Sequence, residues 1–271
     1  MSAARMAKPA KRTLNRQRLL DKRGMPDLPE ARASLIAWLG ERENVARTYL
    51  EAVAEVPRHA FAPAAFWRAA YLDMELWGPA AFLPRPSVVA RMATSLGEAG
   101  ARKVLEYATG TGYVTVILAM LFDRVDTVEH DPWQLWLSSD AFRELELLNI
   151  SQKASDGYLG WRERAPYDGI VVCAAMPRIP RVLMEQLVEG GVCLAPIGSY
   201  NGPHRLLRAV KSSEGTSVSD LGLCYFPPLM GVWTSPYVGW DGDVEPEQVD
   251  HRSPRVFAGR HAVDRGTALA R

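Results

Sequence analysis

The stretch Val104-Leu-Glu-Tyr-Ala-Thr-Gly-Thr-Gly112 decides the fold of this 271-residue chain. Its apolar beginning is typical of a short buried strand, which ends at Glu106 and is followed by a turn with two glycines. The apolar run 113–122 then predicts a buried helix. A strand, a tight turn and a helix N-terminus bring backbone N–H groups to one point, where an anionic or polar cofactor group can sit.

A second acid follows at the place where a nucleotide-type cofactor needs one. The segment 126–129, Asp-Thr-Val-Glu, predicts another strand, and Glu129 lies 17 residues after Gly112. Nucleotide-binding βαβ units place an acid roughly 20 residues on, where it accepts hydrogen bonds from ribose hydroxyls. The dinucleotide pattern G-x-G-x-x-G is absent, so NAD fits poorly and an adenosine-type cofactor is indicated. The alternative is an ordinary tight connection between a strand and a helix.

The composition is that of an ordinary soluble globular protein, with 48% hydrophobic and 23% charged residues. A net charge of +1 creates no global field that would attract nucleic acid or membranes. The three cysteines lie far apart in strand-like surroundings, as buried thiols of a reducing compartment do, and neither they nor the five histidines have metal-ligand spacing. No apolar run has the length of a membrane span and no signal peptide is evident, so we expect a cytoplasmic protein.

The chain divides into four predicted regions. Residues 1–28 carry eight basic residues and one acid by position 24, which predicts a basic flexible tail; a contact with an acidic partner and an Arg-rich transit sequence are the alternatives. Residues 29–100 predict a helical lead-in, with a loop at 77–86 and Ser87 as the N-cap of the next helix. Residues 101–233 form the core, and the mixed charges of 234–271 predict a mobile or partner-dependent extension.

Within the core, strands and helices alternate. Runs that are apolar throughout, such as 169–174, predict a parallel sheet covered on both faces. The last two strands have no long helix between them, so we expect an antiparallel hairpin at one edge. The sequence therefore predicts a three-layer, Rossmann-like α/β fold. We expect strands at 103–106, 125–129, 168–173, 191–196, 205–210 and 222–227, and helices near 113–122, 132–148 and 179–188.

Several segments, taken in order, resemble the protein-L-isoaspartate O-methyltransferases, which use S-adenosylmethionine (SAM) to esterify the carboxylate of damaged aspartyl residues. The order and spacing agree across about residues 55–230, and the resemblance implies the class I methyltransferase fold with SAM as cofactor. The glycine turn alone would fit any class I methyltransferase, whereas the segments 56–63 and 174–180 are more specific to this family. The matching segments are Val-Pro-Arg-His-Ala-Phe-Ala-Pro (56–63), the turn 106–112, Asp-Gly-Tyr-Leu-Gly-Trp (156–161), Ala-Ala-Met-Pro-Arg-Ile-Pro (174–180) and Ala-Pro-Ile-Gly (195–198).

The resemblance also implies which residues meet the cofactor and the methyl acceptor. For the strand-ending acids the alternative role is a solvated carboxylate, and for residues 156–157 it is a simple turn. The implied residues around the SAM methionine and ribose are Glu106, Ala108, Thr109, Gly110 and Gly112, with Glu129 on the ribose hydroxyls, His130 beside the adenine, and Asp156 and Gly157 at the adenine edge. The implied acceptor residues are Phe82, Pro84, Arg85, Ala174, Ala175 and Pro196.

Two positions depart from the family's pattern. Ala108 replaces the first glycine of the turn; if its φ is positive, the Cβ costs on the order of 1 kcal/mol and narrows the space beside the cofactor. Where the family has a Gln-Thr-Ile-Ser-type segment whose serine faces the transfer site, this chain has Ala-Phe-Leu-Pro at 81–84. Pro84 has neither a hydroxyl nor a backbone N–H, and Phe82 replaces a small polar side chain. Arg85 is the one new group there that can pair with a carboxylate, unless it is simply solvated.

We therefore predict a SAM-dependent carboxyl O-methyltransferase that acts on an Asp or isoAsp carboxylate of a protein or peptide, with altered acceptor specificity of the peptide-tailoring type. An acceptor carboxylate is already ionised at pH 7, so catalysis is mainly positioning and desolvation, and we assign no catalytic residue. A SAM-binding or degenerate interaction module without turnover is the alternative that Ala108 and Pro84 suggest. Nucleic-acid methylation ranks last, since only the basic N-terminus suggests it.

Overall fold

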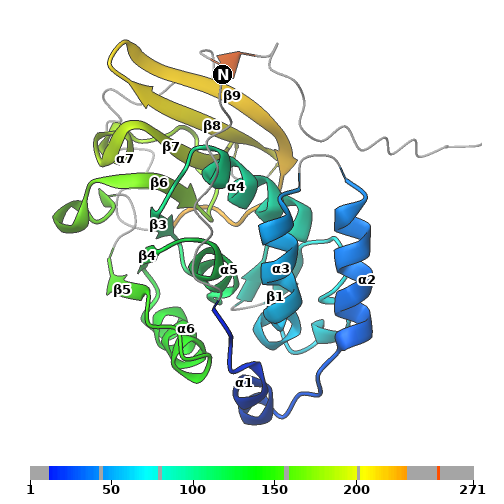
Figure 1. Ribbon diagram of the computed structural model, residues 1–271. Coiled ribbons are helices and arrows are strands. Elements are labelled where there is room, and N and C mark those ends of the chain that lie inside the picture. Colours follow the sequence, from blue (N-terminus) through cyan, green and yellow to red (C-terminus); the bar gives the residue numbers. More distant parts are fainter. Residues whose placement is uncertain are drawn as a thin grey trace, which may run out of the picture.

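A computed structural model describes residues 12–42, 45–78, 81–155, 159–199, 202–230 and 249–250 (Figure 1). Asp156 and Gly157, both predicted at the adenine edge, lie outside the described residues. The same is true of residues 1–11 of the predicted tail and of the predicted C-terminal extension apart from 249–250.

The described part of the chain builds one eight-stranded sheet with the order β10-β9-β8-β7-β6-β3-β4-β5. The strands from β5 to β7 are parallel, and β8 and β9 add an antiparallel hairpin, as the sequence predicts. The two-residue β10 pairs parallel to β9 at the edge. The strands are β3 (Lys103–Tyr107), β4 (Arg124–Glu129), β5 (Ile150–Ala154), β6 (Tyr167–Val172), β7 (Leu187–Ile197), β8 (His204–Ser212), β9 (Gly215–Cys224) and β10 (Val249–Asp250).

Helices cover both faces of this sheet. Successive side chains of a strand point to opposite faces, so Val104 belongs to one buried apolar cluster and Leu105 to a second one across the sheet. α4, α5 and α6 contribute to the first cluster, while α7 covers the second. The lead-in helix α3 packs on α4 and α5, with α2 outside it (Figure 1). The helices are α1 (Arg16–Arg23), α2 (Pro29–Gly40), α3 (Arg47–Glu55), α4 (Pro86–Glu98), α5 (Tyr113–Leu121), α6 (Pro132–Glu144) and α7 (Arg181–Glu185), with short 3-10 helices at Arg58–Phe61, Trp67–Ala69 and Arg162–Arg164.

The predicted three-layer fold is thus confirmed, although several elements differ from their predicted bounds. The helix predicted near 179–188 is α7, which ends at Glu185, and β7 already begins at Leu187. β5 is not among the predicted strands, because three of its five residues are polar and it forms the sheet edge beside β4. β9 spans Gly215–Cys224 rather than the predicted 222–227, since its polar, partly exposed first half gives little apolar signal. Polar edge strands are hard to recognise from apolar runs, which mark strands buried on both faces.

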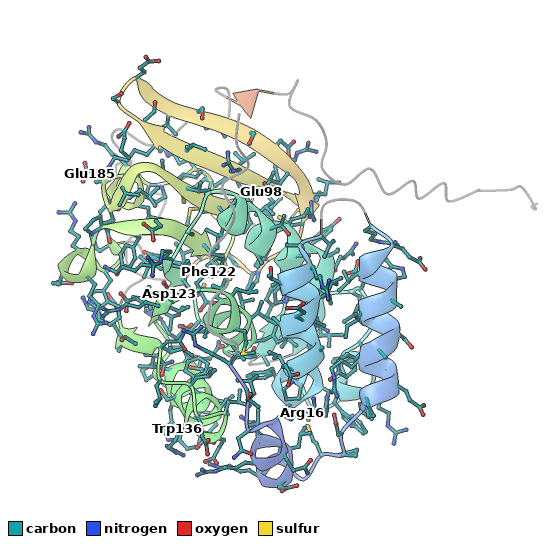
Figure 2. The ribbon with its side chains drawn as sticks, viewed as in Figure 1. Arg16, Glu98, Phe122, Asp123, Trp136 and Glu185 are labelled. Carbon is teal, nitrogen blue, oxygen red and sulfur yellow. The ribbon has the colours of Figure 1, made fainter. Side chains whose placement is uncertain are left out.

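The predicted flexible tail is wrong for residues 12–28. Residues 16–23 form α1, in which Leu19 and Leu20 are fully buried. The basic charges find their partners within the chain: Lys22 Nζ lies 2.6 Å from Asp140 Oδ1 on α6. Arg12 donates hydrogen bonds to the carbonyl oxygens of Ala119 (2.7 Å) and Phe122 (2.9 Å) at the end of α5. Figure 2 labels Phe122, which lies near the irregular segment that precedes α1.

The region predicted as a loop at 77–86 is also different. Residues Leu76–Gly78 (β1) and Ala81–Leu83 (β2) form a two-stranded antiparallel hairpin, in which Trp77 pairs with Phe82. Ser87 does not cap the next helix, because α4 already begins at Pro86. Instead, Asp73 accepts hydrogen bonds from the Ser87 N–H (2.8 Å) and hydroxyl (2.9 Å), so the capping carboxylate comes from a distant residue.

Within the described residues, no helix combines the length and the apolar character needed to cross a membrane. The same part of the chain has no group of three His, Cys, Asp or Glu side chains placed to hold a metal ion. The three cysteines are buried and free.

Candidate cofactor and acceptor site

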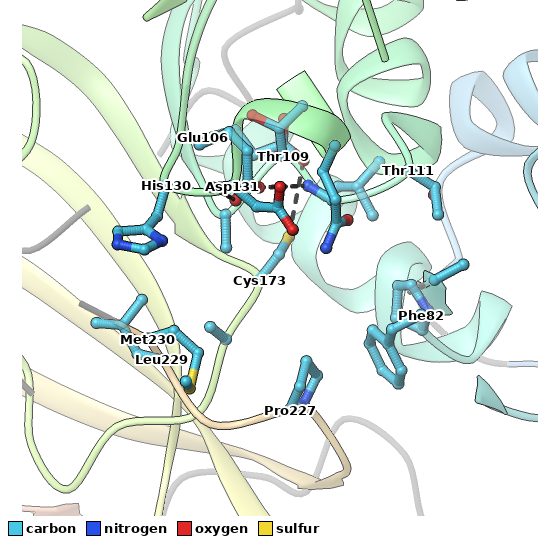
Figure 3. A pocket seen from close by; sticks show the side chains of 18 of the residues that line it. Phe82, Glu106, Thr109, Thr111, His130, Asp131, Cys173, Pro227, Leu229 and Met230 are labelled. Carbon is cyan, nitrogen blue, oxygen red and sulfur yellow. Dashed lines mark hydrogen bonds between the residues drawn. The ribbon is translucent and has the colours of Figure 1, made fainter. Parts of the chain in front are cut away.

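A cavity of about 520 Å³ opens where β3 and β4 end, between the glycine turn and the β1–β2 hairpin (Figure 3). This volume is typical of small-molecule sites, which cover about 300–1,000 Å³. One wall is polar and contains Glu106, Thr109, Gly110, Glu129, His130, Asp131 and Gln134. The other wall is apolar and contains Trp77, Phe82, Pro84, Ala174, Pro227, Pro228, Leu229 and Met230.

The glycine turn is held against β4 by its own backbone. The N–H groups of Ala108 and Thr109 both donate to the carbonyl oxygen of Val128, at 3.0 and 3.3 Å. The φ angles are +65° at Ala108, +54° at Gly110 and +85° at Gly112. Ala108 therefore adopts the left-handed conformation that makes its Cβ unfavourable, at a cost of about 1–2 kcal/mol.

Gly112 is required for a second reason, which is close packing. A Cβ on this residue would lie 2.8 Å from a ring carbon of Phe142 and 3.0 Å from Ser138 Cβ, both on α6. The glycine thus lets α6 approach the N-terminus of α5. The approach brings the beginning of α6, and with it Asp131 and Gln134, to the cavity.

Glu129 organises the end of β4. It is 7% exposed, its Oε2 accepts the Gly110 N–H at 2.8 Å, and its Oε1 accepts the Asp131 N–H at 2.9 Å. Each carboxylate oxygen accepts more than one hydrogen bond, so both retain capacity for ligand hydroxyls. The alternative of a solvated acid at the strand end is wrong for this residue.

Glu106 is fully buried at the end of β3, so the solvated alternative is wrong there too. The hydroxyls of Thr115 and Thr127 (2.9 Å) donate to its Oε2, and Cys173 Sγ lies 3.8 Å from its Oε1. Burial raises the pKa of the Glu106 carboxyl to about 8, against the lowering effect of these hydrogen bonds. The carboxyl is therefore largely protonated at pH 7.

The beginning of α6 supplies the third side of the polar wall. Asp131 is the N-cap of this helix and accepts the Trp133 N–H at 2.8 Å. His130 is exposed and lines the cavity beside it. Further along the same helix, the exposed Trp136 stacks on Trp133 with ring centroids 5.0 Å apart, and it points away from the body of the protein (Figure 2).

The apolar wall carries a row of aromatic rings. The ring centroids of Trp77 and Phe82 are 4.6 Å apart, and those of Phe82 and Phe226 are 5.5 Å apart. Behind this row, the fully buried Arg58 donates to the carbonyl oxygens of Pro84 (2.8 Å) and Met74 (3.3 Å), so it fixes both ends of the hairpin. Of the residues that the sequence assigns to the acceptor, Phe82, Pro84 and Ala174 line the cavity.

The other three predicted acceptor residues do not line the cavity. Arg85 precedes α4 and pairs with Glu75 at 3.1 Å, so its charge has an internal partner. Ala175 is fully buried and its N–H donates to the Pro227 carbonyl at 2.7 Å. Pro196 is buried within β7, where its carbonyl accepts a neighbouring backbone N–H.

Sequence reasoning missed one whole side of the cavity. Residues 227–230 close the apolar wall, and they are held there because the Leu229 N–H donates to the Ala175 carbonyl at 2.8 Å. Trp77 and Gln134 also line the cavity. The only signal for the 227–230 wall is the Pro-Pro pair after β9, which marks an end of regular structure but indicates no partner.

Comparisons with known proteins agree on one family. Residues 31–232 match the sequence model of the family described as Protein-L-isoaspartate(D-aspartate) O-methyltransferase. The Protein-L-isoaspartate O-methyltransferase of Pseudoalteromonas translucida (strain TAC 125) is 37% identical over 201 residues, which cover 73% of this chain and 94% of that protein.

Two solved structures are similar in fold. A protein-L-isoaspartate O-methyltransferase has a TM-score of 0.67 at 23% identity, covering 74% of this chain and 66% of that chain. A beta-aspartate methyltransferase (PCMT) from Plasmodium falciparum, in complex with S-adenosyl-L-homocysteine, has a TM-score of 0.57 at 17% identity and covers 81% of this chain and 99% of that chain.

Proposed function

The chain belongs to the protein-L-isoaspartate O-methyltransferase family, and from this premise we propose that it methylates an Asp or isoAsp carboxylate of a protein or peptide. It is a SAM-dependent methyltransferase, and we propose that its acceptor specificity differs from that of the repair enzymes. The observation that carries the proposal is the cavity itself, because it joins a polar wall suited to the cofactor to an apolar wall suited to the reacting end of an acceptor.

The polar wall fits SAM. Glu129 holds the ribose hydroxyls through the free lone pairs of its two oxygens, and the glycine turn lies against the ribose and the methionine part. His130 and the start of α6 lie at the adenine end. The proposed cofactor residues are Glu106, Ala108, Thr109, Gly110, Glu129 and His130, which line the cavity, and Gly112, which shapes the turn; Asp156 and Gly157 at the adenine edge remain a prediction.

The chain needs no proton-transfer group for this reaction. Bound SAM supplies an activated methyl group, which the acceptor oxygen takes as the carbon–sulfur bond breaks with its electron pair going to sulfur. The carboxylate is consumed as an anion and no proton moves, so positioning and exclusion of water are the protein's tasks. Trp77, Phe82 and Leu229 give one wall of the cavity apolar side chains.

The acceptor specificity is altered with respect to the repair enzymes. Pro84 stands where the family has a serine, and its only polar backbone atom, the carbonyl oxygen, is already bonded to Arg58. Phe82 adds a large ring beside it, held between Trp77 and Phe226. A dedicated peptide acceptor, as used by peptide-tailoring enzymes, suits this apolar wall. We further propose that residues 234–271 contribute to recognition of that acceptor.

The first experiment is methyl transfer from SAM to two matched short peptides, one with isoaspartate and one with aspartate, measured by mass spectrometry. Methylation of the aspartyl peptide supports the altered acceptor. Methylation confined to the isoaspartyl peptide contradicts it, because the repair chemistry would then survive without the serine.

A second experiment tests the extension. Removal of residues 234–271 is expected to weaken acceptor binding without changing the affinity for S-adenosylhomocysteine, measured by calorimetry. An unchanged KM for the acceptor would overturn the role of these residues.

The alternative function is a SAM-binding module without turnover. The positive φ of Ala108 favours it, because the Cβ lies beside the proposed cofactor position. Calorimetry with SAM and S-adenosylhomocysteine separates the two: micromolar binding together with turnover of any acceptor dismisses this alternative.

A further inference from the structure

The cavity has an unusual charge inventory for an enzyme that binds a carboxylate. Among the described residues that line it, Glu129 and Asp131 are acids, Glu106 is a third acid that is largely protonated at pH 7, and none is a lysine or an arginine. His130 lies at the exposed edge. Enzymes that hold a carboxylate commonly do so with a lysine or an arginine, and here the lining provides neither.

The arginines next to the hairpin do not fill this gap. Arg58 is fully buried, donates to the Pro84 carbonyl at 2.8 Å and is not among the residues that line the cavity. Arg85 is paired with Glu75. Both cations are therefore committed to holding the hairpin and the start of α4.

The chain that continues from the lining adds no cation either. Residues 79–80 connect two lining residues, and residues 231–248 follow Met230; neither segment contains a lysine or an arginine. Residues 231–248 instead contain four acids, at positions 241, 243, 245 and 247. The sequence that follows Met230 is thus acidic.

A carboxylate that enters such a cavity loses water and gains no counter-charge from the described residues that line it. An unpaired buried charge is strongly unfavourable, and Glu129 and Asp131 add repulsion. Thr111 and Gln134 supply only neutral hydrogen-bond donors. A positive charge on the cofactor would remove this penalty, because opposite charges attract strongly in a poorly hydrated site.

On the basis of the proposed function, we propose that the charge of the cofactor controls acceptor binding. The Asp or isoAsp carboxylate binds only beside a positively charged cofactor, and the neutral S-adenosylhomocysteine leaves it without a partner. Binding of the acceptor and of the cofactor is therefore coupled, and the coupling is reciprocal. One consequence is that unreacted acceptor does not form a stable complex with the product-loaded enzyme.

The test is a binding measurement with two cofactor analogues and two peptides. Sinefungin carries an ammonium group in place of the methylsulfonium of SAM, whereas S-adenosylhomocysteine is neutral there. The peptides are the aspartyl peptide of the transfer assay and its asparaginyl counterpart, with affinities measured by fluorescence anisotropy on the full chain. We expect the aspartyl peptide to bind the sinefungin complex at least about tenfold more tightly than the S-adenosylhomocysteine complex, and the asparaginyl peptide to bind both alike.

A variant tests the same inference from the protein side. Met230 lines the cavity and is 67% exposed, so Met230→Lys places a cation there without disturbing the core. It is expected to raise the affinity of the aspartyl peptide for the S-adenosylhomocysteine complex, whereas Met230→Gln leaves it unchanged.

Two results would overturn the inference. One is equal affinity of the aspartyl peptide for the two cofactor complexes, and the other is no affinity for the sinefungin complex. If the peptide is nevertheless methylated by SAM, only the inference about charge fails. If neither analogue binds the protein at all, the proposed function fails with it.

Discussion

The backbone N–H of Gly110 donates a 2.8 Å hydrogen bond to the carboxylate of Glu129, which lies 19 residues further along the chain. This bond ties the glycine turn after β3 to the end of β4. The turn is therefore shaped before any ligand arrives, and the residue proposed to bind the ribose is also the residue that fixes the turn. Preorganisation of this kind lowers the ordering cost of binding.

Replacement of Glu129 tests this double role. Both of its oxygens accept backbone N–H groups, from Gly110 and Asp131. In Glu129→Gln the side-chain NH₂ group, a hydrogen-bond donor, replaces one of these acceptors and meets a backbone N–H that also donates. We expect the Kd for S-adenosylhomocysteine to rise by about tenfold to a hundredfold, as loss of a hydrogen bond to a charged group predicts. Calorimetry measures this directly.

The control for Glu129→Gln is Asp131→Asn, which also removes a negative charge at the cavity. Asparagine caps helices as well as aspartate does, so the Trp133 N–H keeps its partner. An equal loss of affinity in both variants would mean that charge alone, and not the geometry of the turn, determines binding.

Ala108→Gly removes a strain that the structure reveals. Alanine at φ +65° costs about 1–2 kcal/mol, while the greater freedom of glycine in the unfolded chain returns about 0.4–1 kcal/mol of that. We expect a small net stabilisation, with Tm higher by a few degrees at most, roughly 2–4 °C per kcal/mol for a chain of this size. The affinity for SAM should also rise. A lower Tm would show that the left-handed conformation at 108 is not retained.

Glu106 predicts a specific pH dependence of stability. Its pKa rises from 4.5 to about 8 on burial, so between these values the folded state holds a proton that the unfolded state has lost. The contribution of this residue to the free energy of unfolding is therefore greatest at low pH and falls as the pH rises towards 8. Glu106→Gln does not titrate, so the stability of the variant relative to wild type should increase from pH 5 to pH 8, measured by urea unfolding. A difference that does not change with pH would contradict the raised pKa.

The parts of the site that could be predicted belong to one strand–helix–strand unit of consecutive elements. The turn 106–112 and Glu129 lie at the ends of neighbouring parallel strands, and such ends meet at one edge of the sheet. The 227–230 wall could not be predicted, because it reaches the cavity only through backbone hydrogen bonds to Ala175. The family resemblance placed Ala175 in the acceptor site, whereas in the structure its backbone bonds to Pro227 and Leu229 and its side chain does not line the cavity.

Charged residues were the hardest to assign, because their partners are remote. Arg85 was the predicted partner for an incoming carboxylate, and it is paired with Glu75 ten residues earlier. The basic residues of α1 suggested a solvated tail, whereas two of them, Arg18 and Lys22, bind acids of α6. Charge patterns along a chain do not identify an ion pair that the fold creates. The apolar pair Leu19 and Leu20 was the available signal for α1.

Pro84→Ser restores the hydroxyl that the family places at the transfer site. The Pro84 carbonyl keeps its bond to Arg58, so the hairpin should be retained. We expect the rate with the isoaspartyl peptide to rise by about tenfold or more, the value of one hydrogen bond to a charged group, with a loss of stability of about 0.4–1 kcal/mol. Pro84→Ala is the matched control, since it regains the N–H but not the hydroxyl. An equal gain in both variants would assign the effect to the backbone N–H.

Leu20→Ala tests whether α1 is an integral part of the fold. The side chain is fully buried, so its truncation should cost about 2–5 kcal/mol in the free energy of unfolding. Gln17→Ala, on the exposed side of the same helix, should change it by less than about 0.5 kcal/mol. Urea unfolding curves of the two variants give the comparison. Equally small changes in the free energy of unfolding would mean that residues 12–28 are a flexible tail after all.

The docking of α1 has a consequence for biosynthesis. Lys22 and Arg18 bind acids of α6 that lie 118 and 126 residues later, and Arg12 binds carbonyls at the end of α5. Domains fold as they leave the ribosome, beginning from the N-terminus. Here α1 can contact the early lead-in residues Asp27 and Glu55, but its partners on α6, and those of Arg12 on α5, are missing until the segments around the glycine turn have emerged. The contacts of Arg12 and α1 with α5 and α6 therefore form only after more than a hundred further residues have been made.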